Sequence, residues 1–224
     1  MPHFKLEIVC ANIESVVSTQ RAGADRIELC ENLEEGGTTP SYGLIEVSQK
    51  KFSGALHVMI RPRGGDFIYS PDEFEIMKHD IEVCKKLNVQ GVVFGLLNAD
   101  GTIDSRRTKE LTELAKPLSV TFHRAFDHAS DTMQALEAVI DCDCHRILTS
   151  GAAPNAVKGA EMLTTLIKKS AGRIIIMPGG GVRSENISEL LKTGAVELHS
   201  SAMVSKEMKA DESEIRKMKS LLAG

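Results

Sequence analysis

The chain has 224 residues, 42% of them hydrophobic and 26% charged, which is typical of a globular protein with a sizeable core. A net charge of −4 and the lack of Trp argue against an electrostatic nucleic-acid surface and a base-stacking platform. No apolar stretch approaches the roughly 20 residues of a membrane span. The first ten residues do not resemble a secretion signal, and an odd number of cysteines favours reduced thiols, so we expect a cytoplasmic protein.

Short apolar runs alternate with longer amphipathic segments along the whole chain. The runs that predict β-strands are residues 4–9, 25–30, 55–61, 91–95, 119–123, 146–150, 173–178 and 196–200. The clearest helical segments are residues 71–87, 104–116 and 184–194, the last with Ser184 as a candidate N-cap and Gly194 as a candidate C-cap. The strands barely alternate and are followed by helices, which indicates a parallel sheet covered on its outer side.

Eight strand–helix units favour a (β/α)8 barrel of the TIM type. The alternative, an open doubly wound sheet, requires an edge strand, and none of the eight runs is polar or interrupted by Pro. No linker or low-complexity tract divides the sequence, so we expect one domain over residues 1–224.

The connections around the strands are of two kinds. Those that precede strands are short, such as AGAD, SG and TGA. Those that follow strands are longer and rich in Gly, Arg, His and hydroxyl groups, such as RPRGGDFIYS, HRAFDHAS and PGGGVRS. Barrel enzymes work at the end where strands run into helices, so we expect a functional site there.

Two carboxylates lie inside apolar strands, Glu7 in the first and Glu28 in the second. A buried charge is costly unless it is paired, so one interpretation is a structural polar layer in which both pair with Arg61 or His123. The other is that one carboxylate is a general acid or base whose pKa is tuned by burial and the arginines. Both interpretations stay open.

The segment VTFHRAFD places His123 at the end of the fifth strand, and His199 ends the eighth, so both imidazoles should face the barrel mouth. Asp127 could orient His123 or cap the next helix. Arg124 follows His123 directly and so points the other way on a strand, which favours a packing or interface residue over a ligand contact. We therefore take His123, His199 and Asp127 as candidate catalytic residues, together with Glu7, Glu28 and Arg61.

The segment MPGGGVRSEN is a glycine-rich turn after the seventh strand. Glycine lets backbone N–H groups approach an anion, and this is the usual phosphate position of such barrels. The candidate anion-binding residues are Gly179, Gly180, Gly181, Ser200 and Arg63. No Lys ends strand six or seven, and neither a hydrolytic zinc pattern nor a G-x-S-x-G motif occurs.

Cys10 and Cys30 end adjacent strands on the predicted site face, where soft thiolates suit Cu(I). Core packing is the alternative for both. Cys142 and Cys144 precede the sixth strand and belong to the opposite face, and Cys84 is expected to pack in a helix.

The motifs LEIVC, GADRIELCENLEEGGTTPS, VMIRPRGGDFIYS, VFGLLNADGTID, VTFHRAFD, RILTSG and IIMPGGGV together resemble the CutC family of copper homeostasis proteins. The resemblance implies a cytoplasmic (β/α)8 barrel that forms a homodimer or larger homo-oligomer. It also implies copper handling, with Cu(I) bound by cysteine in some members, which carries over to Cys10 and Cys30.

Two functions have support in the sequence, and a third, a scaffold that acts through its oligomer surface, is neither supported nor excluded by it. One is a copper-binding protein that uses Cys10 and Cys30. The other is an enzyme that uses His123 with Glu7 or Glu28 on a small phosphorylated or otherwise anionic metabolite. Apart from Cu(I) we expect no cofactor, and we expect no nucleic-acid or membrane partner.

Overall fold

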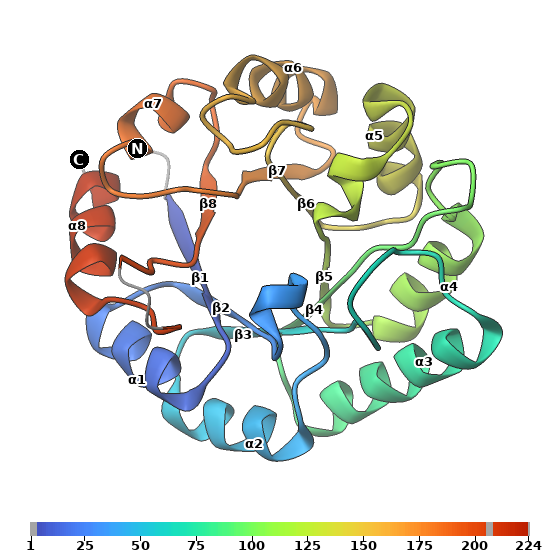
Figure 1. The fold of residues 1–224 in the computed structure, drawn as a ribbon, viewed down its shortest axis with the longest axis horizontal. Helices are drawn as coiled ribbons and strands as arrows, with labels where there is room; N and C mark the ends of the chain where they lie inside the picture. Colours follow the sequence, from blue (N-terminus) through green and yellow to red (C-terminus); the bar gives the residue numbers. More distant parts are fainter. Residues whose placement is uncertain (1–3, 205–207, 224) are drawn as a thin grey trace.

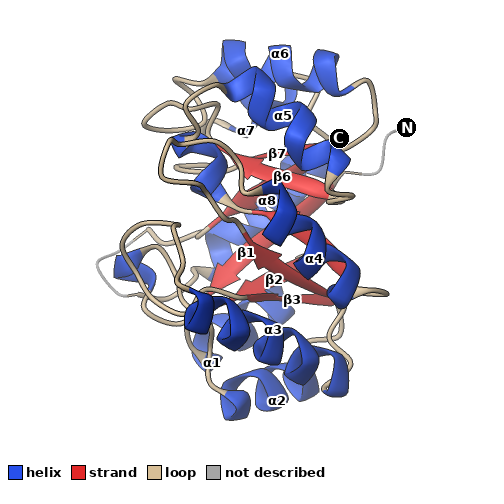
Figure 2. Ribbon diagram, turned by 90° about the vertical axis from the view of Figure 1, so that its right-hand side faces the viewer, coloured by secondary structure: helices blue, strands red, loops and turns tan. Residues whose placement is uncertain are grey.

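The computed structural model describes residues 4–204 and 208–223. Eight parallel strands form a ring surrounded by helices, as Figure 1 shows along the ring axis and Figure 2 from the side. The hydrogen-bonded order is β7-β6-β5-β4-β3-β2-β1-β8. β7 and β8 lie next to each other (Figure 1), and no ladder joins them among the described residues. The predicted (β/α)8 barrel is confirmed as a nearly closed barrel.

The strands are β1 (Lys5–Cys10), β2 (Arg26–Leu29), β3 (Ala55–Met59), β4 (Gly91–Phe94), β5 (Ser119–Phe122), β6 (Arg146–Thr149), β7 (Ile175–Pro178) and β8 (Glu197–Ser200). The α-helices are α1 (Ile13–Ala22), α2 (Tyr42–Lys51), α3 (Pro71–Lys86), α4 (Ser105–Ala115), α5 (Thr132–Asp141), α6 (Ala160–Ser170), α7 (Ile187–Leu191) and α8 (Glu212–Ala223). Two short 3₁₀ helices, η1 (Leu33–Glu35) and η2 (Arg124–His128), follow β2 and β5. No helix within residues 4–204 and 208–223 is both long and apolar enough to cross a membrane.

Local chemistry explains where the predicted helices begin. α3 starts with a capping box, in which the Ser70 hydroxyl accepts from the Glu73 N–H and the Glu73 carboxylate accepts from the Ser70 N–H. Asp104 caps α4 by accepting from the Arg107 N–H. The predicted helix over 184–194 is wrong in extent, because α7 spans only Ile187–Leu191. The N–H and hydroxyl of Ser184 both bind the Glu214 carboxylate in α8, so Ser184 is not a helix cap.

Strand alternation divides the core into two parts. Leu6, Ile8 and Cys10 of β1 pack in the large cluster that includes the helices. Val9 belongs to a small cluster with Cys30, Met59 and Val93 inside the barrel. Several inward positions closer to the amino ends of the strands carry charged groups, among them Glu7, Arg26 and Glu197.

A network of buried charged side chains lies inside the barrel, toward the amino ends of the strands. Arg26 binds Glu7 through Nε and lies 2.6 Å from Glu197 Oε2 through Nη2. Arg146 Nε approaches the same Glu197 oxygen at 3.0 Å. All four side chains are less than one-tenth exposed. Breaking a buried network leaves the remaining charges without compensation, so these strands depend on its integrity.

We predict that Arg26→Ala lowers the free energy of unfolding by about 3–5 kcal/mol, because Glu7 and Glu197 both lose a buried counter-charge. Urea denaturation followed by circular dichroism measures this. The matched control is Arg216→Ala, which removes an exposed pair with Glu212 and should cost ~0–1 kcal/mol. Equal losses in the two variants would show that the buried network is not essential.

Candidate functional site

A cavity of about 500 Å³ opens at the carboxyl ends of the strands. Its wall includes Glu28, Arg61, His123, Arg124, Gly180 and His199. Four of the six predicted catalytic residues line this cavity: Glu28, Arg61, His123 and His199. Glu7 does not line it but contacts His199, which does.

Glu7 is fully buried and both of its oxygens are engaged. Oε1 lies 2.7 Å from His199 Nδ1, and Oε2 binds Arg26. Burial alone would raise the pKa of Glu7, but the charges of Arg26 and His199 hold it well below its usual range. Glu7 is therefore a permanent carboxylate that supports other groups, and it has no free oxygen to offer a substrate.

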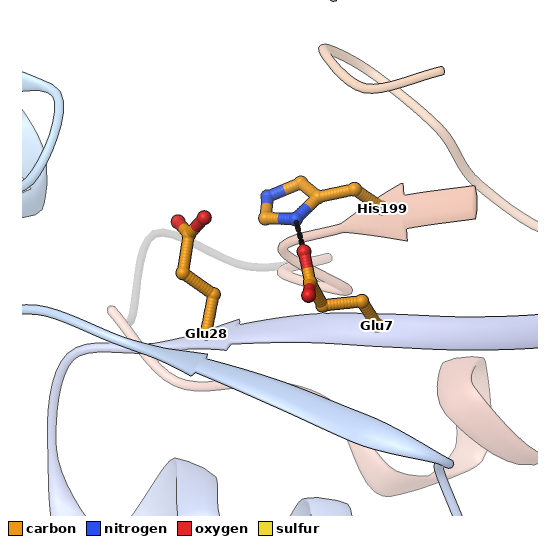
Figure 3. Close-up of side chains that lie close together, drawn as sticks. All are labelled: Glu7, Glu28 and His199. Atoms are coloured by element: carbon orange, nitrogen blue, oxygen red, sulfur yellow. Dashed lines mark hydrogen bonds and ion pairs between the residues drawn. The ribbon is translucent and has the colours of Figure 1, made fainter. Parts of the chain in front are cut away.

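His199 projects from β8 toward β1 and β2 (Figure 3). Burial opposes a charge on its ring, but the Glu28 and Glu7 carboxylates outweigh that effect and raise the pKa of His199. Because Nδ1 is directed at Glu7, Nε2 is the nitrogen left for the cavity. This is the arrangement of an oriented, chargeable imidazole.

Glu28 lies across from the His199 ring (Figure 3) and accepts no hydrogen bond from the described residues. Burial raises the pKa of Glu28 to about 7, with a further contribution from the negative charge of Glu7. A carboxyl group with this pKa exists in both protonation states near neutral pH. Glu28 is the titratable group of the cavity that is best suited to exchange a proton.

The three side chains could also be considered as metal ligands, since one donor atom of each lies within 4.8 Å of the others. Two observations weigh against this use. Arg26 occupies one Glu7 oxygen and His199 the other. Oxygen and imidazole donors are also not the soft set that Cu(I) prefers.

His123 is buried and plays a different role from His199. Its Nδ1 accepts a hydrogen bond of 3.2 Å from the Ala125 N–H, so a neutral ring carries its proton on Nε2, which has no partner among the described residues. Burial, together with the positive charge of Arg61, lowers the pKa of His123 to about 3. His123 is a fixed neutral N–H donor and not a base.

Arg61 serves mainly as a clamp. Its Nη1 donates to the carbonyls of Glu35 and Gly37 at 2.6 and 2.9 Å, and Nη2 donates to that of Gly65 at 2.8 Å. These bonds join the β2 loop, which contains η1 (the short blue helix near the centre of Figure 1), to the β3 loop. Arg61 therefore contributes charge to the cavity, and Nε is the guanidinium nitrogen that has no partner among the described residues.

Two other predicted site residues do not line the cavity. Arg63 is bound outside it to Glu73 and Asp66. Asp127 does not orient His123 and does not cap α5, whose cap is Asp131. Instead Asp127 accepts hydrogen bonds from Ser150 and Ala152 in the β6 loop and pairs with Arg124 Nε at 2.8 Å.

The glycine turn lies at the mouth, but some of its predicted partners differ. Gly180 and Gly181 line the cavity, whereas Gly179 packs against Leu148 and continues the β7 pairing. Ser200 faces away from the barrel interior and donates to the Val182 carbonyl at 2.6 Å, so Ser201 is the hydroxyl at the cavity wall.

Arg124 also lines the cavity, contrary to our expectation from strand alternation. The chain leaves the strand after Phe122 and turns into η2, so the alternation ends before Arg124.

The structure does not bring the Cys10 and Cys30 side chains to one face. Cys10 Sγ lies 3.5 Å from Thr19 Oγ1 of α1, outside the barrel, and Cys30 packs inside. Burial raises the pKa of Cys10 to about 12 and also raises that of Cys30. Cys142 and Cys144 make separate contacts with Ser105 and Thr112 near the opposite end of the barrel.

We predict that Glu28 makes stability fall as pH rises from about 4.5 to about 7. The unfolded chain releases this proton near 4.5 whereas the folded chain holds it to about 7, so ionisation in that window favours unfolding. Glu28→Gln should remove this slope, on the order of 3 kcal/mol, in urea denaturation across pH 4–8. Parallel curves for the two proteins would contradict the assignment.

Comparison with known proteins gives one consistent result. A model of the CutC family matches residues 4–204. A CutC family protein from Chromobacterium violaceum is 52% identical over 198 residues, covering 88% of this chain and 80% of that protein. A human protein named "Copper homeostasis protein cutC homolog" is 46% identical over 200 residues, covering 89% of this chain and 73% of that protein.

Solved structures agree with the sequence comparison. A CutC crystal structure from Streptococcus agalactiae has a TM-score of 0.84 at 32% identity, covering 88% of this chain and 98% of that one. Thiamine phosphate pyrophosphorylase from Pyrococcus furiosus shares the fold alone, with a TM-score of 0.65 at 17% identity over 99% and 96% of the chains. The chain belongs to the CutC family.

Proposed function

We propose that this protein is an enzyme that transfers a proton on a small anionic metabolite bound in the barrel mouth. The observation that carries the proposal is Glu28, a fully buried carboxyl without a hydrogen-bond partner among the described residues, which lies at the cavity wall with a pKa of about 7. Burying such a group is unfavourable for folding, and active sites are where such groups occur.

The neighbouring groups divide the work of such a reaction. The Glu28 carboxylate would accept a proton from a carbon next to a carbonyl group of the substrate. The electron pair of the C–H bond would move to form an enolate, whose oxygen would accept the His123 Nε2–H bond. Where the reacting carbon carries a hydroxyl group, Glu28 would then return the proton to the former carbonyl carbon, while the hydroxyl proton passes to the enolate oxygen, which gives the isomeric carbonyl compound. A neutral histidine as donor and a raised carboxyl pKa as base are a known division of roles.

Glu7 and His199 would influence this reaction through their charges, which act on Glu28. The charge on Glu7 disfavours a second negative charge on Glu28, while a protonated His199 favours it. Proton movement at His199 would therefore adjust the basicity of Glu28. Arg61 would add positive potential at the mouth, where backbone carbonyls hold its Nη groups in place.

We predict that the protein catalyses hydrogen–deuterium exchange at the carbon next to the carbonyl of its substrate. Proton NMR in D₂O, applied to a panel of phosphosugars and organic acids, detects this as loss of a C–H signal. Glu28→Gln should slow the exchange by about 10²–10⁴-fold. The matched control is Arg63→Gln, which lies outside the cavity and should keep the wild-type rate. Failure of the whole panel to bind or exchange would contradict the proposal.

Copper handling is the second candidate, because the human relative carries a copper homeostasis name. A soft donor pair supports it within this chain. A β-carbon built on Gly37 would lie 3.3 Å from Cys30 Sγ and 3.4 Å from Met59 Cε, so both sulfur side chains meet beneath that glycine. Thiolate and thioether suit Cu(I). Joint binding by Cys10 and Cys30 stays a prediction, as do the cytoplasmic location and the homo-oligomer.

For the copper candidate we predict one Cu(I) per chain, lost in Cys30→Ser and retained in Cys10→Ser, in anaerobic titration with a competing Cu(I) chelator. The physical reason is that Cys10 contacts α1 outside the barrel whereas Cys30 lies beside Met59. Equal loss in both variants would restore the two-thiol site. No difference between either variant and the wild type would remove both thiols from copper binding.

A further inference from the structure

The β7–α7 turn presents two unused backbone donors to the cavity. Gly180 and Gly181 have φ values of +93° and +78°, which side chains other than glycine adopt only with strain. Neither N–H donates a hydrogen bond within the part of the chain that the structure describes, and both residues line the cavity. Backbone N–H groups at such a turn suit an anion.

A guanidinium group is held beside this turn. Arg124 donates to Asp127 through Nε at 2.8 Å and to the Ser150 hydroxyl through Nη2 at 2.9 Å. Its Nη1 makes no hydrogen bond to a described residue, and it would lie 3.5 Å from a β-carbon built on Gly180. The Arg124 side chain is 44% exposed, so a ligand can reach it.

Asp127 fixes the position of that guanidinium. Its carboxylate is only 6% exposed and accepts from the Ser150 and Ala152 N–H groups at 3.1 Å. It is therefore tied to the loop after β6 and cannot follow Arg124 if the arginine moves. Asp127 is therefore a positioning residue for Arg124. The proposed proton transfer does not use Asp127, so this is the role that the structure assigns to its carboxylate.

Ser201 adds a fourth donor at the same wall. Its Oγ accepts from Arg183 Nη2 at 2.9 Å, so the hydroxyl proton is free to be donated to a ligand. Ser201 follows β8, and the glycine turn follows β7, which lies next to it (Figure 1).

From these four donors we infer a subsite for a phosphate monoester, formed by the Gly180 and Gly181 N–H groups, Arg124 Nη1 and the Ser201 hydroxyl. A phosphate offers three terminal oxygens to donors that arrive from different elements, whereas a carboxylate offers two in one plane. This deepens the proposed function and rests on it for the reacting end: the phosphate would lie on the β7 side of the cavity, and the reacting carbon would face Glu28.

The direct test is titration of the wild-type protein with inorganic phosphate, followed in ¹H–¹⁵N spectra. The Gly180 and Gly181 amide signals should move in a saturable way, and acetate at the same concentration should move them less. Shifts confined to other residues, or equal shifts with acetate, would overturn the inference. Because this uses the wild-type chain, it does not depend on a variant that folds.

Variants then identify the donors. Arg124→Gln should weaken phosphate binding about tenfold or more, as expected for loss of a charge-assisted hydrogen bond. The control Arg63→Gln removes an equal charge from a side chain outside the cavity and should leave the affinity unchanged. Equal affinities in the two variants would remove Arg124 from the subsite.

Glu28→Gln separates this inference from the proposed function. Phosphate should bind this variant at least as well as the wild type, since no phosphate donor is lost. Phosphate binding with no proton exchange on any phosphorylated compound would reject the enzyme proposal and keep the subsite. Exchange on compounds without phosphate, at rates equal to their phosphorylated forms, would reject the subsite and keep the enzyme.

Discussion

The buried carboxylate of Glu7 determines the electrostatics of the whole barrel mouth. One of its oxygens pairs with Arg26, the centre of the network of buried charged side chains. The other contacts His199, which lines the cavity. A fully buried charge survives only with such partners. The same carboxylate therefore connects the stability of the barrel to the protonation of its mouth.

The pKa values of the remaining groups reflect burial together with this interaction. Burial is the main reason that Glu28 keeps a proton that an exposed glutamate would lose, and the negative charge of Glu7 adds to it. The Glu28 and Glu7 carboxylates raise the pKa of His199 against the effect of burial, whereas burial and the charge of Arg61 lower the pKa of His123 to about 3. The pKa values of the two carboxyl groups and of the two imidazoles are thus driven apart, which is the condition that acid–base catalysis needs.

Much of this could be predicted from sequence, and the failures have physical causes. The strands are predictable because each apolar run marks a strand to within a few residues. The barrel topology then predicts that Glu28, His123 and His199 lie at the same mouth. The ion network was not found, although Arg26 and Glu197 stand two residues before Glu28 and His199 and so share their inward direction. Arg124 and Ser201 were missed because strand alternation stops where each strand ends.

The two candidate functions make different demands on the molecule. Copper handling would use the sulfur atoms of Cys30 and Met59, which explains neither the donors of the β7–α7 turn nor the raised pKa of Glu28. Proton chemistry uses the polar wall and leaves Cys10 as a core residue beside Thr19. The phosphate subsite belongs with the second demand, because it supplies a reason for an arginine held by a buried aspartate at the same mouth.

The central claim, that the pKa values of the two histidines at the mouth are shifted in opposite directions, is tested most directly by ¹⁵N NMR of the histidine side chains across pH 5–9. We predict that His123 remains neutral with its proton on Nε2 over the whole range, and that His199 remains protonated to a higher pH than an ordinary histidine. Joint titration of both rings near the ordinary histidine pKa would contradict the account.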